Sequence, residues 1–236
     1  NGGCIRFGPD GYLYLATGDG SGIADQRKTG QDISDLFGSI LRLDVDHHAD
    51  GKPYAVPSDN PFVGVAKARP EIWSYGHRQI WKFSWDSADG TMWAGEVGQD
   101  LWEMIYIIQR GGNYGWSVRE GRHPFRPDRP KGPGEFIEPI VEHPHHDFRS
   151  ITGGFVYHGT RLPELRGHYI YGDYDTGKLW ALKWDAKARS VRANFELCDV
   201  QLRVVDFGQT PDGEIFIVDF VGGQLHELAH APPVTD

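Results

Sequence analysis

Four segments of this chain repeat one pattern, and that pattern restricts the fold more than any other feature of the sequence. Each segment joins a short β-type run to an aromatic-rich run through a tight turn that contains Asp or Thr next to Gly. The segments are RFGPDGYLYLATGD (6–19), SWDSADGTMWAGEV (84–97), YGDYDTGKLWALKW (171–184) and FGQTPDGEIFIVDF (207–220). Turns of this type between apolar runs predict β-hairpins.

These hairpins predict an all-β fold. No segment shows a helical periodicity of useful length, and we expect strands over 40–44, 102–108 and 153–159, with surface loops over 47–70 and 117–149. Units of four short strands that recur every 40–50 residues or so are typical of a β-propeller.

At that spacing the 236 residues supply about four blades. We therefore expect a single β-propeller domain over 1–236, incomplete at its N-terminus. An unclosed propeller exposes sheet surface, which favours association. Self-association, or a second chain that closes the propeller, is therefore expected.

Composition excludes some classes of function. The net charge of −9 argues against a nucleic-acid partner, because such a partner favours a basic face. No apolar run reaches the roughly 20 residues that span a bilayer, and no signal peptide begins the chain. Cys4 and Cys198 show no metal-ligand spacing, so two free thiols and a disulfide are both compatible with the sequence.

Ordered motifs along the chain indicate a family. The succession NGG, FGPDGYLYLATGDG, LFGSILRLDVD, YGHRQIWKFSWD, GEVGQDLWEMI, GGNYGW, SITGGFVYHG and PDGEIFIVDF resembles the glucose/sorbosone dehydrogenase family from Asn1 to about Leu228. The resemblance implies a six-bladed, calcium-dependent quinoprotein that uses pyrroloquinoline quinone (PQQ). It also implies a periplasmic or secreted location, because enzymes that use PQQ work outside the cytoplasm.

In this family the general base is a His immediately before the stretch that reads Asn1-Gly2-Gly3 here, so that His lies outside this sequence. Asp19 matches the carboxylate that orients the base. A carboxylate in that place fixes the imidazole tautomer and raises its basicity. The alternative is that Asp19 only caps its own turn.

The resemblance assigns cofactor contacts to Arg78, Gln79, Trp81, His158 and Arg203. A planar guanidinium suits a carboxylated quinone. Gln79-Ile80 replace the usual Asn-Pro, and Gln201 replaces a second Arg. The alternatives are an ion pair between blades for Arg78 and a structural role for His158.

The resemblance also implies two calcium sites. The carbonyl groups of Val97 and Gly98 match those that bind the calcium next to the quinone, and Glu103 and the carbonyl of Tyr114 match a structural site. Calcium prefers six to eight oxygen ligands. The alternative for Glu103 is an exposed charge on an edge strand.

A separate His-rich run contains His143, His145, His146 and Asp147. It is either a further metal site or a set of unrelated side chains.

Three functions follow from these observations. The first is a PQQ- and calcium-dependent dehydrogenase that oxidises the C1 hydroxyl of an aldose sugar to a lactone and passes electrons to an external acceptor or a fused haem domain. The second is a non-catalytic propeller module of a larger exported protein, which the departures at 79, 80 and 201 favour. The third is a propeller lactonase, which requires several acidic or amide ligands around an axial calcium; these are not seen at matching strand starts.

Overall fold

The structure is a computed structural model that describes residues 3–49 and 51–230. Strands dominate this part of the chain, and the one helical segment in it is the 3-10 turn η1 (Pro163–Leu165). No helix among the described residues is long and apolar enough to cross a membrane. The all-β fold predicted from the hairpins is confirmed.

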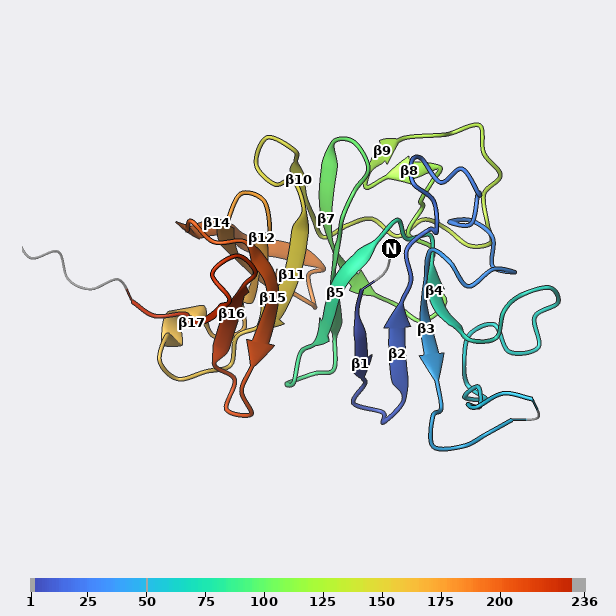
Figure 1. Cartoon of the computed structure of the whole chain (residues 1–236), viewed down its shortest axis with the longest axis horizontal. Coiled ribbons are helices and arrows are strands. Elements are labelled where there is room, and N and C mark those ends of the chain that lie inside the picture. Colours follow the sequence, from blue (N-terminus) through green and yellow to red (C-terminus); the bar gives the residue numbers. More distant parts are fainter. Residues whose placement is uncertain (1–2, 50, 231–236) are drawn as a thin grey trace, which may run out of the picture.

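Four antiparallel sheets follow one another in chain order, from the blue strands at the right of Figure 1 to the orange and red strands at the left. The first sheet contains β1 (Ile5–Phe7), β2 (Leu13–Ala16), β3 (Ser39–Leu43) and β4 (Ile72–Tyr75). The second contains β5 (Ile80–Trp85), β6 (Met92–Glu96), β7 (Trp102–Ile108) and β10 (Val141–Pro144).

The third sheet contains β11 (Ile151–Val156), β12 (Tyr169–Asp173), β13 (Lys178–Asp185) and β14 (Ser190–Asp199). The fourth contains β15 (Val204–Gln209), β16 (Ile215–Asp219) and β17 (Gln224–Glu227). A small ribbon of β8 (Arg119–Glu120) and β9 (His123–Pro124) lies between β7 and β10 in the chain.

Each predicted hairpin turn connects the first two strands of a sheet or two central strands. In the turn between β5 and β6, Gly90 has a φ of +76°, a backbone conformation that glycine adopts without steric cost. The carboxylate of Asp89 accepts the amide of Thr91 at 2.9 Å, as Asp side chains do in turns. The turn residues therefore set the start of β6.

The expected loop over 117–149 is wrong in part, because it contains β8, β9 and β10. β10 forms the outer edge of the second sheet, where it pairs with β7. Its sequence, Val-Glu-His-Pro, has no apolar alternation, and an edge strand tolerates Pro144 because one side of the strand needs no amide donor.

Apolar side chains fill the three spaces between neighbouring sheets. One cluster joins the first and second sheets around Tyr14 and Phe83, another joins the second and third around Ile105 and Tyr169, and a third joins the third and fourth sheets. Cys4 lies in the first cluster, and both cysteines are free thiols. The disulfide alternative is therefore wrong.

The first strands of the last three sheets run in the same direction. Ser84 on β5 donates to the carbonyl of Gly154 on β11 at 2.7 Å. Thr152, at the start of β11, bonds the carbonyl of Val204, and Gln209 at the end of β15 bonds the carbonyl of Val156. Residues that precede β5 and β15 therefore lie at one end of the molecule, and residues that follow β5 and β11 lie at the other.

Candidate functional site at the start of the inner strands

Asp19 follows β2 and is buried, with hydrogen bonds to both carboxylate oxygens. Oδ2 accepts the indole N–H of Trp116 at 2.8 Å, and Oδ1 accepts the amide of Ser21 at 2.9 Å. The amide of Asp19 donates to the carbonyl oxygen of Arg78 at 3.0 Å. The fold thus brings together two residues that the sequence assigned to one site.

Arg78 lies between β4 and β5, and its side chain is partly buried. The guanidinium donates to the carbonyl of Val97 at 3.3 Å and to Oε1 of Gln99 at 3.4 Å. The same Gln99 oxygen accepts the amide of Ala24 at 3.1 Å. Within the described residues the guanidinium of Arg78 forms no ion pair, and the acid beside it, Glu96, bonds the Arg78 amide instead.

The loop over 97–101 is held from one side by buried acids. Gly98 donates its amide to Glu103 at 3.2 Å, and the amides of Gln99 and Asp100 donate to Glu120 at 2.5 and 2.7 Å. In a trans peptide the carbonyl points opposite to the following N–H. The carbonyls of Val97 and Gly98 therefore point away from these acids, and that of Val97 points toward Arg78.

Glu103 is fully buried, so the alternative of an exposed edge charge is wrong. Its oxygens accept three donors: the amide of Gly98, Nε2 of His145 at 2.8 Å and the amide of Ile151 at 2.8 Å. Burial raises the pKa of Glu103, against the effect of the hydrogen bonds. The hydrogen bond to Glu103 raises the pKa of His145. Donors already surround this carboxylate, and such a set does not fit calcium.

The side chain of Tyr114 lies in the apolar core, on the face of the sheet opposite to Glu103, and a calcium role for its carbonyl stays a prediction. Its ring stacks on His77, with 4.5 Å between centroids, and meets Tyr106 edge-on at 4.9 Å. Tyr106 and Glu103 are three residues apart on β7, so they point to opposite faces of the sheet. In the described part of the chain, no group of three or more His, Cys, Asp or Glu side chains is arranged to hold a metal ion.

Gln79 and Trp81 flank the first residue of β5. The carbonyl of Gln79 accepts the amide of Val97 at 2.9 Å. The indole N–H of Trp81 donates to the carbonyl of Val205 at 2.9 Å, which links β5 to β15. Gly3 lies against the Trp81 ring, whereas Asn1-Gly2 lie outside the described residues.

Arg203 precedes β15, as Arg78 precedes β5, so both lie at the same end of the inner strands. Arg203 already has an anionic partner, Oδ1 of Asp175 at 2.7 Å. His158 is not brought to this end. It follows β11 and bonds Asp86 at 2.6 Å beyond the end of β5, a strand that spans about 20 Å. We therefore leave His158 out of the site.

The His-rich run does not converge on one point. His143 is buried and bonds the hydroxyl of Tyr171, His145 bonds Glu103, and His146 is exposed beside Asp147. The three rings thus serve different contacts, and the metal alternative for this run is not supported by their placement.

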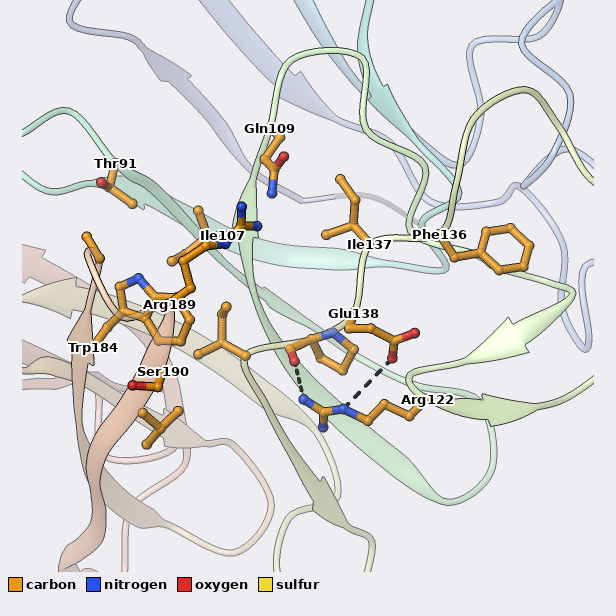
Figure 2. A pocket seen from close by; sticks show the side chains of 14 residues that line it. Thr91, Ile107, Gln109, Arg122, Phe136, Ile137, Glu138, Trp184, Arg189 and Ser190 are labelled. Carbon is orange, nitrogen blue, oxygen red and sulfur yellow. Dashed lines mark hydrogen bonds and ion pairs between the residues drawn. The ribbon is translucent and has the colours of Figure 1, made fainter.

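A large groove lies elsewhere on the molecule. Figure 2 shows a groove of about 770 Å³ that is lined by Ile107, Trp184 and Arg189, among others. It lies beside the β5–β6 turn, at Thr91, and none of the predicted site residues lines it. Its polar side chains are exposed or partly buried, and Arg122 is already paired with Glu138, so chemistry rather than size identifies the site around Arg78.

Four supporting residues were not assigned a role from the sequence: His77, Gln99, Trp116 and Glu120. The first three lie inside the motifs YGHR, GEVGQD and GGNYGW, so their position beside assigned residues was the signal that could have found them. Glu120 lies in the expected loop over 117–149 and carried no signal.

Comparison with known proteins identifies the family. A family profile described as Glucose / Sorbosone dehydrogenase matches residues 1–226. The chain belongs to the glucose/sorbosone dehydrogenase family. The HIPL1 protein of Arabidopsis thaliana is 37% identical over 201 residues, which cover 76% of this chain and 29% of that protein. The aldose sugar dehydrogenase YliI of Escherichia coli (strain K12) is 28% identical over 97% of this chain and 59% of its own length.

A solved structure agrees with this membership. The PQQ-bound aldose sugar dehydrogenase of Streptomyces coelicolor is 26% identical, with a TM-score of 0.70, over 95% of this chain and 60% of that one. The similarity shows that the sheets form a β-propeller of the glucose/sorbosone dehydrogenase type. The chain spans about a third to three fifths of the length of these relatives.

The residues of this family member fit an anionic quinone in part. Arg78 offers an unbalanced, partly buried guanidinium with hydrogen bonds of only 3.3 and 3.4 Å. Arg203 fits less well, because Asp175 already balances its charge. The carbonyls of Val97 and Gly98 fit a hard cation, whereas the donors around Glu103 do not.

Proposed function

We propose that this chain binds PQQ as part of a quinoprotein that oxidises the C1 hydroxyl of aldose sugars to lactones. Arg78 is the observation that carries the proposal, because a partly buried guanidinium without an anionic partner favours an anionic ligand. The family membership and the PQQ-bound relative support the same class of reaction.

The proposed roles follow from placement. Arg78 binds the polar edge of the quinone, with Gln79 and Trp81 beside it, and Arg203 binds a carboxylate of the cofactor by exchanging Asp175 for it. PQQ, when bound, supplies the two-electron acceptor for the sugar. Asp19 is the carboxylate that orients a histidine base, which the resemblance places before Asn1.

The proposal includes one calcium site, at the backbone carbonyl groups of Val97 and Gly98. Because the amides that follow them donate to Glu103 and Glu120, both carbonyl oxygens point away from these acids, and that of Val97 points toward Arg78. Oxygen ligands of that kind suit a hard cation. An electron acceptor, or a fused haem domain, and an exported location complete the proposal.

A titration with PQQ, with and without Ca²⁺, tests this function. We expect quenching of tryptophan fluorescence at micromolar PQQ, with binding at least about tenfold weaker in Arg78→Ala. Arg192→Ala is the matched control, because Arg192 is an exposed arginine that pairs with Asp185. Absence of binding by the wild-type chain, or equal affinity in Arg78→Ala, would contradict the proposal.

The second candidate is a non-catalytic binding module of a larger exported protein. The ion pair of Arg203 with Asp175, together with Gln79-Ile80 and Gln201 at positions where the family has other residues, favours it. Dye reduction with aldoses, measured on the protein extended to include the histidine before Asn1, separates the two candidates, since a binding module reduces no dye even when PQQ is bound.

A further inference from the structure

A chain of buried polar side chains runs beneath Arg78. Oγ of Ser74 lies 3.0 Å from Nε2 of His77, and Nδ1 of His77 lies 3.0 Å from Oε2 of Glu96. The other oxygen of Glu96 accepts the amide of Arg78 at 2.7 Å. Because a carboxylate oxygen accepts, Nδ1 of His77 carries a proton, and in the neutral ring Nε2 then accepts from Ser74.

This network is enclosed. His77 is 0% exposed and Glu96 is 2% exposed. The imidazole stacks on Tyr114 with an angle of 24° between the rings, and the amide of His77 donates to Gly38 at 3.0 Å. Ser74 belongs to the outer strand of the first sheet and Glu96 ends the second strand of the next sheet. The network therefore ties the two sheets together where they meet the site.

The network contacts the backbone on both sides of the proposed ligand position. Glu96 bonds the amide of Arg78, and the residue after Glu96 is Val97, whose carbonyl accepts the Arg78 side chain. The fixed carboxylate thus determines where the guanidinium and the Val97 carbonyl lie relative to each other. Buried hydrogen-bonded groups of this kind lock a functional side chain in one geometry.

We propose that His77 and Glu96 are positioning residues that hold Arg78 and the Val97 carbonyl in the arrangement that receives the anionic cofactor. The proposal rests on the proposed function. It assigns no contact with the cofactor to either residue. Their effect passes through the Arg78 amide and through the chain from Glu96 to Val97.

Two variants test the proposal. His77→Phe keeps an aromatic ring on Tyr114 but removes both ring nitrogens, and Glu96→Gln keeps one acceptor oxygen for two donors. Glu71→Gln is the matched control, because Glu71 is a fully buried carboxylate whose partners are Lys52, Tyr54 and Arg69. It contacts neither Arg78 nor the loop over 97–101.

Two measurements are made on each variant: hydrogen exchange by mass spectrometry over 76–82 and PQQ affinity by fluorescence titration. We expect faster exchange of the Arg78 amide and about tenfold weaker PQQ binding in His77→Phe and Glu96→Gln, and neither change in Glu71→Gln, whatever its melting temperature. Wild-type exchange and affinity in both variants would overturn the inference and leave the proposed function intact.

Measurements on the wild type and on Arg78→Ala distinguish failure of the proposed function from failure of the positioning role alone. If the wild type binds no PQQ, the proposed function and this inference both fail. If the wild type binds and Arg78→Ala does not, but His77→Phe and Glu96→Gln bind like the wild type, only the positioning role is refuted. If Glu71→Gln loses as much affinity as they do, general loss of stability explains the effect and the inference is again refuted.

Discussion

His143 makes the stability of this protein sensitive to pH between about 6.5 and 4. The ring is 4% exposed, stacks on Phe148 with 4.2 Å between centroids, and meets Trp180 edge-on. Nε2 lies 2.7 Å from the hydroxyl of Tyr171. Burial in this aromatic cluster lowers the pKa of His143 from 6.5 to about 4, because the charged form loses its hydration.

The sign follows from proton linkage. As the pH falls below 6.5, the unfolded chain binds a proton at His143 before the folded protein does, so protonation favours unfolding. Stability is therefore highest above 6.5 and decreases toward pH 4. The shift of pKa corresponds to a loss on the order of 3 kcal/mol in total, of which about 2 kcal/mol falls between pH 7 and pH 5.

Chemical denaturation at several pH values measures this effect. We expect His143→Phe, which keeps the aromatic packing, to flatten the dependence between pH 7 and 5 by about 2 kcal/mol, or about 4–8 °C in melting temperature. His146→Gln, at an exposed histidine of the same run, serves as the control. Equal slopes for the wild type and His143→Phe would refute the reasoning, whatever the absolute stability of the variant.

Three further changes have definite expected outcomes. Burial opposes the ionisation of Glu71, but hydrogen bonds from two cations and a tyrosine hydroxyl outweigh it and hold its pKa at about 2. The ionised Glu71 therefore stabilises the fold above about pH 4.5, and this stabilisation is lost toward pH 2. Glu71→Gln should lower the free energy of unfolding by about 2–3 kcal/mol at pH 7, measured by urea denaturation. An unchanged denaturation midpoint would contradict this. A Cβ on Gly98 would lie 1.7 Å from the Trp102 carbonyl oxygen, so Gly98→Ala should lower the free energy of unfolding by about 3 kcal/mol. A Cβ on Gly22 would meet no atom, so Gly22→Ala should change it by no more than about 0.5 kcal/mol. Glu120→Gln should speed amide exchange over 98–101 and cost about 1–2 kcal/mol; exchange at the wild-type rate would show that Glu120 does not hold this loop.

The hairpins were predictable because their information is local. An Asp-Gly turn between apolar runs fixes where each strand begins, and the strand expected over 102–108 has those bounds in the structure. Edge strands were not predictable in the same way. β10 and β14 pair on one side and carry many polar residues, so neither shows the alternation that burial of one face imposes.

The candidate site was predictable only as far as a motif marks it. Asp19 and Arg78 were assigned by resemblance, and the fold places them in contact through the backbone. The partners that decide their geometry come from elsewhere in the chain: Trp116 is 97 residues from Asp19, and Glu120 is 21 residues from Gln99. Such contacts depend on how the sheets pack against one another, which no local sequence pattern predicts.

His158 shows the opposite failure. Its strand was expected and lies nearly where the sequence indicated, but the residue falls at the end of β11 rather than its beginning. A resemblance assigns a residue to a site, whereas the direction of the strand decides which end of the molecule that residue reaches. The ion pair with Asp86 then gives His158 a local role.

The bond from Trp81 to the carbonyl of Val205 spans 124 residues of chain, and this has a consequence for biosynthesis. At roughly 5–20 residues per second, the ribosome needs about 6–25 seconds to make the segment between them. During that interval the second sheet can form its hairpins and pack against β11, but the indole N–H of Trp81 lacks its acceptor on β15. Protease cleavage of ribosome-bound chains near 81 should therefore decline further once residue 205 has emerged from the ribosome, because the link between β5 and β15 forms only then.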